Sequence, residues 1–277
     1  MQVRCISDSE MVEQKHGPRS DLELRIRELL ALNCGARSPI NLLLAASGFQ
    51  KLPAFLFGGT LRDLLAFGFL PRDLDIVIRT PNLEQLATEL GHHLVRRTRF
   101  GGMHFLIDGW HFDVWPLRET WAFRTGAVTP CSFSALPRTT FLNVEAVAAE
   151  LNPRPTRSRK LFECGFFEAI ATETVEINLE ENPFPDLCVV RSLLTAARLG
   201  FCIGPRLAKY LAVQGEGMTR ARMSDVQLKH YGEIKSDPEE MMSWLAFVRQ
   251  SRASGVARVK LPLSEPRKLA LRGAWIS

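Results

Sequence analysis

The sequence lacks the features that would place the chain in a membrane or outside the cell. It has no uninterrupted apolar run as long as a membrane span, because the longest candidates, 40–48 and 55–70, are broken by polar residues or glycine. Its first 21 residues contain no apolar core of the kind that defines a signal peptide. We therefore expect a cytoplasmic location and no membrane partner.

Cysteine motifs for metal are also missing. The six cysteines are scattered, with no C-x-x-C pair and no histidine at a matching spacing. We expect reduced, mostly buried thiols and no zinc site. What the chain does have is a net charge of +5 over 277 residues, which suits a polyanionic partner such as nucleic acid without requiring one. The length allows one large domain or two modest ones.

The strongest pattern lies in the stretch 54–80. Residues 54–57 form a short apolar run with aromatics that ends at Gly58 and Gly59. Apolar residues at helical spacing follow in 61–67. This order predicts a strand, a glycine turn and a helix. Glycine lets a phosphate approach the backbone closely, and the first turn of a helix offers unpaired N–H groups to an anion.

A second strand is predicted at 73–78, where the sequence reads DLDIVI. Because side chains alternate across a strand, Asp73 and Asp75 should point to the same face. Two carboxylates so close repel each other unless a cation lies between them. Magnesium prefers hard oxygen ligands and commonly takes one or two carboxylates together with substrate phosphates. The stretch therefore predicts a phosphate site and a metal site separated by one helix and one loop.

The two segments GGTLRD (58–63) and RDLDIV (72–77) resemble the head-domain motif of bacterial-type tRNA nucleotidyltransferases (CCA-adding enzymes) and poly(A) polymerases, within the polymerase-beta-like nucleotidyltransferase superfamily. The resemblance implies that two Mg²⁺ ions are held by Asp73 and Asp75. It further implies that the triphosphate of an NTP, ATP or CTP, is held by Gly58, Gly59 and Arg62, and that Asp63 fixes the helix turn or contacts the ribose.

The resemblance also implies an α+β fold, in which a head with a small mixed or antiparallel sheet flanked by helices precedes an all-helical neck. We expect a polar extension at 1–20, the head at 21–150, a linker and neck at 151–255 and a basic extension at 256–277. Helices are predicted at 21–33, 40–47, 81–92, 189–201 and 205–213, with two more between 223 and 247. Extended runs are predicted at 94–98, 103–107 and 110–117, and 118–140 is expected to be a loop.

Three further head residues are candidates. Enzymes of this kind resemble one another in placing a third carboxylate on a neighbouring strand, and Asp113, which shares a strand face with His111 and Trp115, is the candidate here. The segment 137–146 resembles the family's R-R-D-F-T-x-N-A-L-A element, which holds the incoming nucleotide. Only Arg138 and Asn143 match it, so both are predicted to bind nucleotide.

The segment from 189 to 201 resembles the family's neck helix, L-L-R-A-x-R-F-A-A-R-L-G-F. Arg191 and Arg198, seven residues apart, lie on one helical face and are predicted to bind nucleotide. The family's E-D-x-x-R element, which serves as a protein template for the base, precedes this helix. Its positions here are Phe184, Pro185 and Cys188, so neither the base nor CCA specificity can be assigned from the sequence.

These features predict an enzyme, a template-independent nucleotidyltransferase that acts on an RNA 3′ end, most simply that of tRNA. The strongest local basic cluster, an expected track for an RNA backbone, consists of Arg154, Arg157, Arg159 and Lys160. Two alternatives stay open at this point: transfer of a nucleotide to a protein or small-molecule hydroxyl, and a non-catalytic module that binds nucleotide or RNA. The intact acid pair argues against the second alternative.

Overall fold

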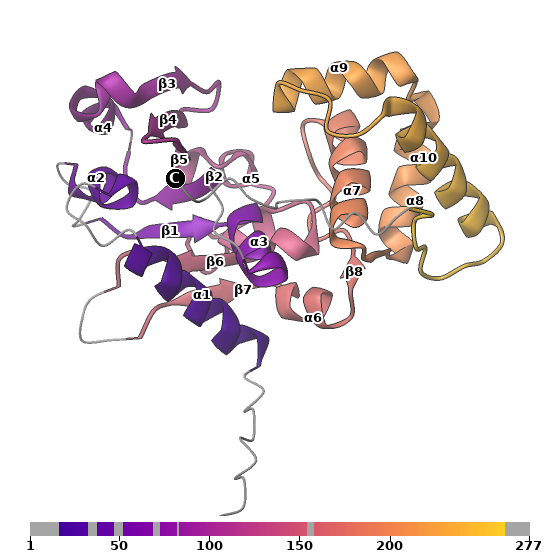
Figure 1. Ribbon diagram of the computed structural model, residues 1–277, viewed down its shortest axis with the longest axis horizontal. Coiled ribbons are helices and arrows are strands. Elements are labelled where there is room, and N and C mark those ends of the chain that lie inside the picture. The colour runs from indigo at the N-terminus through magenta and orange to yellow at the C-terminus, as the bar shows by residue number, and fades with distance from the viewer. Residues whose placement is uncertain are drawn as a thin grey trace, which may run out of the picture.

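The computed structural model describes residues 17–32, 38–46, 52–68, 73–81, 83–153 and 158–263. Arg72 of the second motif, Arg154 and Arg157 of the basic cluster, and most of the two predicted terminal extensions lie outside these ranges. The sheet with its surrounding helices occupies one side of the molecule, and α7 to α10 are gathered on the other (Figure 1). The predicted α+β head followed by a helical region is confirmed.

The head is built on a seven-stranded sheet with the order β3-β4-β5-β2-β1-β6-β7. All neighbouring strands are antiparallel except β2 and β5, which run parallel, so the sheet is mixed as predicted. The strands are β1 (Ala54–Phe57), β2 (Asp73–Ile78), β3 (Leu94–Arg97), β4 (Met103–Ile107), β5 (Trp110–Pro116), β6 (Val147–Glu150) and β7 (Leu161–Glu163). Since β7 pairs with β6, the sheet continues past residue 150, where the sequence placed the end of the head.

Local turn chemistry explains several of these strands. β4 and β5 form the hairpin that Asp108 and Gly109 predicted, with both turn residues at positive φ, as a two-residue turn of this kind requires. The alternation in β2 is also as predicted, because Leu74 and Ile76 are buried while Asp73 and Asp75 lie on the other face.

Different groups of residues cover the two faces of the sheet. One face packs against α1 (Pro18–Leu32), α2 (Pro39–Ala45), α3 (Gly59–Phe67) and α4 (Glu84–Glu89), which bury leucines and isoleucines on it. The other face carries Phe55 and Val77 and is covered in part by the segment 117–136. That segment is not wholly a loop, because it contains the short helix α5 (Trp121–Arg124). The uncovered part of this second face holds the acidic residues of β2.

Several predicted helix boundaries were wrong, including that of the helix predicted over 189–201, which is α7 (Pro185–Leu199). The first helix starts at Pro18, not at Asp21, because proline is well suited to the first turn, where its missing N–H costs nothing, and the backbone N–H groups of Ser20 and Asp21 already bond to the carbonyl of Gly17. The helix predicted over 81–92 is α4, which ends at Glu89, followed by the 3₁₀ turn η2 (Gly91–His93).

The helical region has its own core around α7 (Pro185–Leu199), which buries Val189, Val190 and Leu193 against three later helices. Gly200 ends α7 in the left-handed conformation, as its position predicted. The later helices are α8 (Pro205–Gln214), α9 (Arg220–Tyr231) and α10 (Pro238–Ala253). The region is not entirely helical, since β8 (Thr174–Val175) and β9 (Cys202–Ile203) form a small parallel pair after α6 (Phe166–Ala171).

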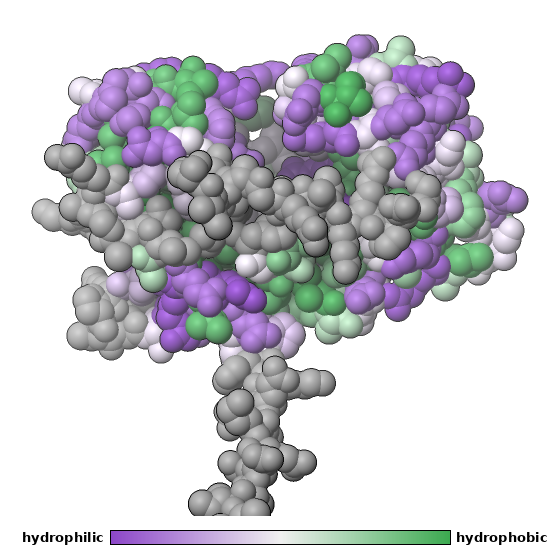
Figure 2. All heavy atoms as spheres, in the orientation of Figure 1, coloured by the Kyte–Doolittle hydropathy of each residue, from purple (hydrophilic) through white to green (hydrophobic). Residues whose placement is uncertain are grey.

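Between the sheet and the helical region the molecular surface is hollowed, and hydrophilic residues lie on both sides of the hollow (Figure 2). None of the helices in the described ranges is both long and apolar enough to cross a membrane.

Candidate functional site

The uncovered sheet face carries three carboxylates on two neighbouring strands. β2 and β5 pair in parallel, with Asp75 directly opposite Asp113 and Asp73 opposite His111. Residues that are directly opposite in paired strands project to the same face. The structure therefore brings together the three aspartates that the sequence predicted as metal ligands.

The carboxylates interact electrostatically. The pKa of Asp75 is raised to about 7, first by its burial and next by the negative charge of Asp113, with smaller contributions from Glu145 and Asp73. Arg191 acts in the opposite direction and lowers this pKa. An acid in this position keeps its charge poorly near neutral pH unless a cation approaches, so the cluster favours a positively charged ligand.

The glycine turn lies beside these acids. Thr60, in the first turn of α3, donates its hydroxyl to the carbonyl of Asp73 at 3.2 Å and accepts the N–H of Asp75 at 3.1 Å. Gly58 precedes the helix with φ of 67° and ψ of −129°, a conformation that is open essentially only to glycine. The start of the helix and the two acids are thus fixed to each other. Thr60 was not predicted; the available signal was a hydroxyl residue directly after the two glycines.

Their chemistry makes the three aspartates suitable ligands for Mg²⁺. Carboxylate oxygens are the hard donors that Mg²⁺ prefers, and the mutual repulsion at Asp75 would be relieved by a divalent cation. Among the described residues, no three acidic, histidine or cysteine side chains are grouped closely enough to hold an ion by themselves. A Mg²⁺ ion held by these aspartates would have to take further oxygens from a bound phosphate and from water.

The predicted phosphate ligand Arg62 is engaged inside the protein. Its side chain is buried and donates from Nε to Asp63 at 2.8 Å and from Nη1 to Glu145 at 2.6 Å. Its guanidinium also lies so close to Gly59 that a Cβ there would come within 3.3 Å of Nη2. Arg62 therefore supports the glycine turn from within the protein. Its predicted contact with phosphate stays a prediction.

Two arginines of α7 complete this ion-pair network. Arg191 contacts both oxygens of Glu145, at 3.3 and 3.2 Å, and the negative charge of Glu145 raises the pKa of Arg191. Arg198 contacts Asp63 at 2.9 Å and lies over the ring of Phe67. The network thus joins α3 in the head to α7 in the helical region.

Arg191 differs from Arg62 in its exposure. Its side chain is 46% exposed, whereas the side chain of Arg62 is 10% exposed. Because Arg191 also lowers the pKa of Asp75, its charge acts on the acid cluster. Solvent or a ligand can therefore reach the side chain of Arg191.

Glu145, at the centre of the network, was not predicted. It lies in the 3₁₀ turn η5 (Asn143–Glu145) and is buried. The available signal was an acidic residue inside the otherwise apolar stretch 144–149. A buried carboxylate needs a cationic partner, and here it has two.

The two matches to the nucleotide-holding element occupy different environments. Arg138, in the 3₁₀ turn η4 (Leu136–Thr139), is exposed and donates to the carbonyl of Thr129 at 3.3 Å. Asn143 donates to the carbonyl of Thr174 and accepts the N–H groups of Val144 and Glu176. The amide of Asn143 therefore fastens η5 to β8. Nucleotide binding by either residue stays a prediction.

The basic cluster is only partly described. Arg159 donates to the backbone carbonyls of Glu150 and Leu151, and its pKa is lowered by burial. Lys160 is exposed. Arg159 thus ties β6 to the segment before β7. Its proposed contact with RNA would require these bonds to be exchanged.

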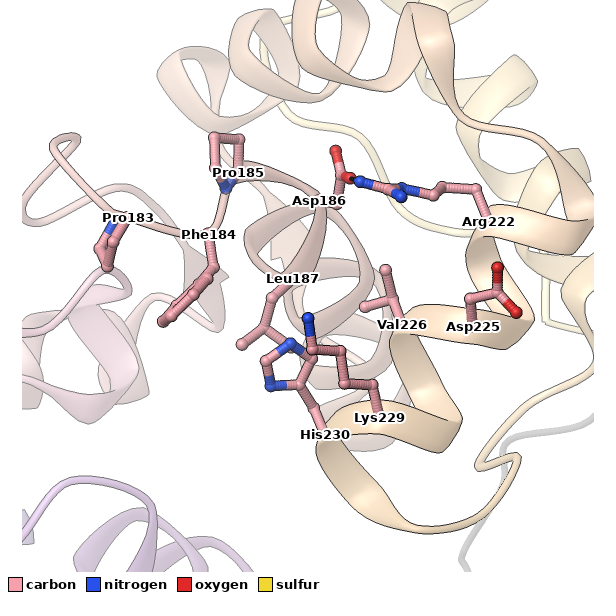
Figure 3. Close-up of a pocket in the computed structure, with 10 residues that line it drawn as sticks. All are labelled: Pro183, Phe184, Pro185, Asp186, Leu187, Arg222, Asp225, Val226, Lys229 and His230. Atoms are coloured by element: carbon pink, nitrogen blue, oxygen red, sulfur yellow. Dashed lines mark hydrogen bonds and ion pairs between the residues drawn. The ribbon is translucent and has the colours of Figure 1, made fainter. Parts of the chain in front are cut away.

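A cavity lies at the start of α7 and is lined in part by Phe184 and Pro185, two of the three positions that the resemblance aligned with the family's base-reading element. It has a volume of about 210 Å³ and is lined from two sides, by 183–187 at the start of α7 and by residues of α9 (Figure 3). Phe184 faces His230 with ring centroids 5.7 Å apart. Asp186 is held by Arg222. The pKa of His230 is lowered by burial and by Lys229, which favours a neutral ring.

Comparison with solved structures shows which fold this is. A CCA-adding enzyme solved with CTP matches with a TM-score of 0.57 and 20% identity, over 82% of this chain and 55% of the other. A complex of the CCA-adding enzyme with ATP matches with a TM-score of 0.55 and 20% identity, over 83% and 53%. The chain has the fold of these enzymes. The predicted resemblance is thereby confirmed at the level of the fold.

A third match is a tRNA nucleotidyltransferase complexed with a primer tRNA and an incoming ATP analog, with a TM-score of 0.53 and 19% identity, over 76% of this chain and 60% of the other. The chain thus spans between 53% and 60% of the length of these three proteins. No protein-family model matches the sequence. No curated protein matches it at the level of sequence either.

Proposed function

We propose that this protein is a template-independent nucleotidyltransferase that uses an NTP and Mg²⁺ to transfer a nucleotide to a hydroxyl group, with the 3′ end of an RNA such as tRNA as acceptor. One observation carries the proposal: three carboxylates on adjacent strands lie beside a glycine turn that opens a helix. The fold supports it, because similar structures are of enzymes solved with CTP, ATP or a primer tRNA.

The three aspartates would hold the metal. Mg²⁺, when bound, would lower the pKa of the attacking hydroxyl and neutralise charge on the triphosphate and on the departing pyrophosphate. Asp75 and Asp113, opposite each other on β2 and β5, form the inner pair, and Asp73 lies one pleat further along β2. No side chain needs to act as a covalent nucleophile, so the protein contributes positions and charges.

The triphosphate would lie at the start of α3. The first N–H groups of a helix have no partner within the helix and favour an anion. Gly58 and Gly59 leave the backbone accessible there, and Thr60 fixes this backbone to the metal-binding strand. The phosphates and the metal would therefore meet at a distance set by the fold and not by a flexible loop.

Arg191 is the arginine that we assign to the triphosphate, because it is about half exposed and acts on Asp75. Arg62 and Arg198 would serve the reaction through the network, by holding Asp63 and Glu145 in place. The base would lie in the cavity against Phe184 and His230. Phenylalanine, proline and a buried cysteine at 184, 185 and 188 offer little hydrogen bonding, so the choice of base should differ from that of CCA-adding enzymes.

The test is incorporation of label. The protein is incubated with Mg²⁺, each labelled NTP in turn, and either total tRNA or a cell lysate. Label on RNA is the expected result. Label on a protein or a small molecule would show that the acceptor is of another kind, and the absence of label from every fraction would contradict the proposal.

Two matched variants control this experiment. Asp75→Asn should abolish labelling, because it removes an inner metal ligand. Asp108→Asn makes the same chemical change in the exposed β4–β5 turn of the same sheet and should label like the wild type. Labelling that survives in Asp75→Asn would remove the acid cluster from the mechanism.

A further inference from the structure

Two histidines form a hydrogen-bonded chain behind the acid cluster. Nδ1 of His104 lies 2.9 Å from Oδ1 of Asp113, and Nε2 of His104 lies 3.1 Å from Nδ1 of His111. The chain therefore runs from Asp113 through His104 to His111. From the sequence, His111 was expected only to share a strand face with Asp113, and no role was predicted for His104.

The strand register explains why these side chains meet. β4 and β5 are antiparallel with His104 opposite Asp113, while β5 places His111 opposite Asp73 of β2. All four side chains consequently project from the same face of the sheet. The side chain of His104 is 15% exposed and that of Asp113 is 34% exposed, so the imidazole is largely enclosed while the carboxylate remains accessible.

The two hydrogen bonds of His104 fix the orientation of Asp113. A carboxylate has no N–H or O–H to offer when ionised, so Nδ1 of His104 must be the donor to Asp113. Nε2 of His104 shares a hydrogen bond with Nδ1 of His111, which holds the His104 ring from its other side. Oδ1 of Asp113 is committed to His104, which leaves Oδ2 as the oxygen that can bind a ligand.

Neither histidine is part of a metal-binding group in the described residues. Their arrangement is that of supporting residues, which in metal sites hold a ligand in its productive orientation through a hydrogen bond. The pair of hydrogen-bonded histidines could not be predicted from the motifs. His104 lies on β4, and none of the motifs includes residues of this strand.

We propose that His104 is a positioning residue for Asp113, that His111 fixes His104 in turn, and that the pair sets the affinity of the site for its divalent cation. The proposal rests on the proposed function in one respect, the role of Asp113 as a metal ligand. It makes no claim about the acceptor or the base.

The test is the binding of Mn²⁺ in the presence of NTP, followed by electron paramagnetic resonance. His104→Leu removes the donor, and His104→Asn keeps an N–H near the position of Nδ1. We expect His104→Leu to weaken Mn²⁺ binding about tenfold. The Mn²⁺ affinity of His104→Asn should be much closer to that of the wild type. His111→Leu should have a smaller effect in the same direction. The control is His92→Leu, which changes an exposed histidine that takes no part in these hydrogen bonds. It should leave Mn²⁺ binding unchanged.

A second measurement does not need metal or activity. In the apo protein, nitrogen-detected NMR should show a proton on Nδ1 of His104, and Asp113→Asn should shift that signal. An unprotonated Nδ1 in the wild type would overturn the proposal, as would a folded His104→Leu protein with wild-type Mn²⁺ affinity, or equal defects in the leucine and asparagine variants.

The outcome for the proposed function is read separately, from nucleotide labelling. Weaker Mn²⁺ binding by His104→Leu in a protein that labels nothing would support the positioning role and contradict the transfer reaction. If the wild type labels RNA while His104→Leu keeps the wild-type Mn²⁺ affinity, the transfer reaction is supported and the positioning role is contradicted. Failure of the wild type to bind Mn²⁺ with any NTP would overturn both.

Discussion

The charge state of Asp75 is the property of a single residue on which the candidate site depends most. Its carboxylate is half-buried on the sheet face with Asp113 as its nearest strand neighbour. Burial and this neighbour raise its pKa from the ordinary range of an aspartate to about 7. The protein therefore keeps in place an acid whose charge is unfavourable until a cation arrives. Sites of function commonly have such perturbed pKa values.

Replacing Asp75 with asparagine should stabilise the metal-free protein at pH 8 and have little effect at pH 4. The folded state binds a proton at Asp75 more tightly than the unfolded state does, so the stability linked to this proton is present in full below the unfolded pKa and is lost as the pH rises to about 7. Asparagine avoids that loss. The expected gain at pH 8 is on the order of 2 kcal/mol, since solvent screens a partly exposed group.

Thermal unfolding in the presence of a chelator, at pH 4, 6 and 8, measures this effect. Asp108→Asn, in the exposed turn of the same sheet, is the control and should show no comparable gain with pH. An effect of Asp75→Asn that is the same at all three pH values would contradict the assigned pKa.

At the scale of elements, helix α3 is fixed at both ends and in its first turn. Gly58 begins it and Gly68 ends it, both with φ of 67°. Thr60 binds its first turn to the backbone of β2. Local sequence predicted the turn at Gly58 and Gly59, because a strand that turns directly into a helix needs a residue free of a Cβ; the end of the helix at Gly68 was not predicted. The link through Thr60 determines where the start of the helix lies relative to the acids.

Gly58→Ala should destabilise the protein by about 1–3 kcal/mol, since an alanine would be strained at φ of 67° and ψ of −129°. The space around Gly58 is open, so the cost comes from the backbone and not from a clash. Urea denaturation measures it. Gly91→Ala is the matched control, because Gly91 also has open space around it but no positive φ. Equal stabilities of the two variants would contradict the strain argument.

At the scale of the whole molecule, an ion-pair network connects the head to the helical region. Glu145 in the head receives Arg62 of α3 and Arg191 of α7, and Asp63 receives Arg62 and Arg198. The network lies between the glycine turn and α7, so it fixes the two walls of the candidate site relative to each other.

Glu145→Leu should destabilise the protein by about 3–5 kcal/mol, because it removes one of the two carboxylates that pair with the buried Arg62. It should also weaken binding of NTP by moving Arg191. The control is Glu28→Leu, which breaks the exposed ion pair with Arg25 in α1 and should cost less than about 1 kcal/mol. Denaturation of both variants, with calorimetry of NTP binding, checks the result. A difference of less than about 1 kcal/mol between them would contradict this role of Glu145.

The cavity between α7 and α9 also belongs to this scale, because neither helix forms it alone. Phe184→Ala should lower the affinity for NTP several-fold, since aromatic stacking on a base contributes about 1–3 kcal/mol. Binding of inorganic tripolyphosphate, which has no base, should be unchanged. Calorimetry with both ligands distinguishes the two effects. Parallel losses for both ligands would place the defect at the phosphate site and remove the base from the cavity.

Sequence alone was sufficient for the features that depend on neighbouring residues. The glycine turn, the shared face of Asp73 and Asp75, the β4–β5 hairpin and the end of α7 at Gly200 all follow from side-chain alternation or from a local backbone requirement. The helix starts were less certain, as Pro18 shows, because several residues near a helix start can supply its first turn.

Only the tertiary structure decided which distant segments meet. The parallel pairing of β2 with β5 sets Asp113 beside Asp75, and the pairing of β4 with β5 sets His104 behind Asp113. Glu145 meets Arg62 across 83 positions of sequence. Periodicity in a sequence reports the face on which a side chain lies, but strand order and register depend on the packing of the whole sheet. The sequence therefore determined the acids and the turn, and the fold determined the residues that neutralise, orient and enclose them.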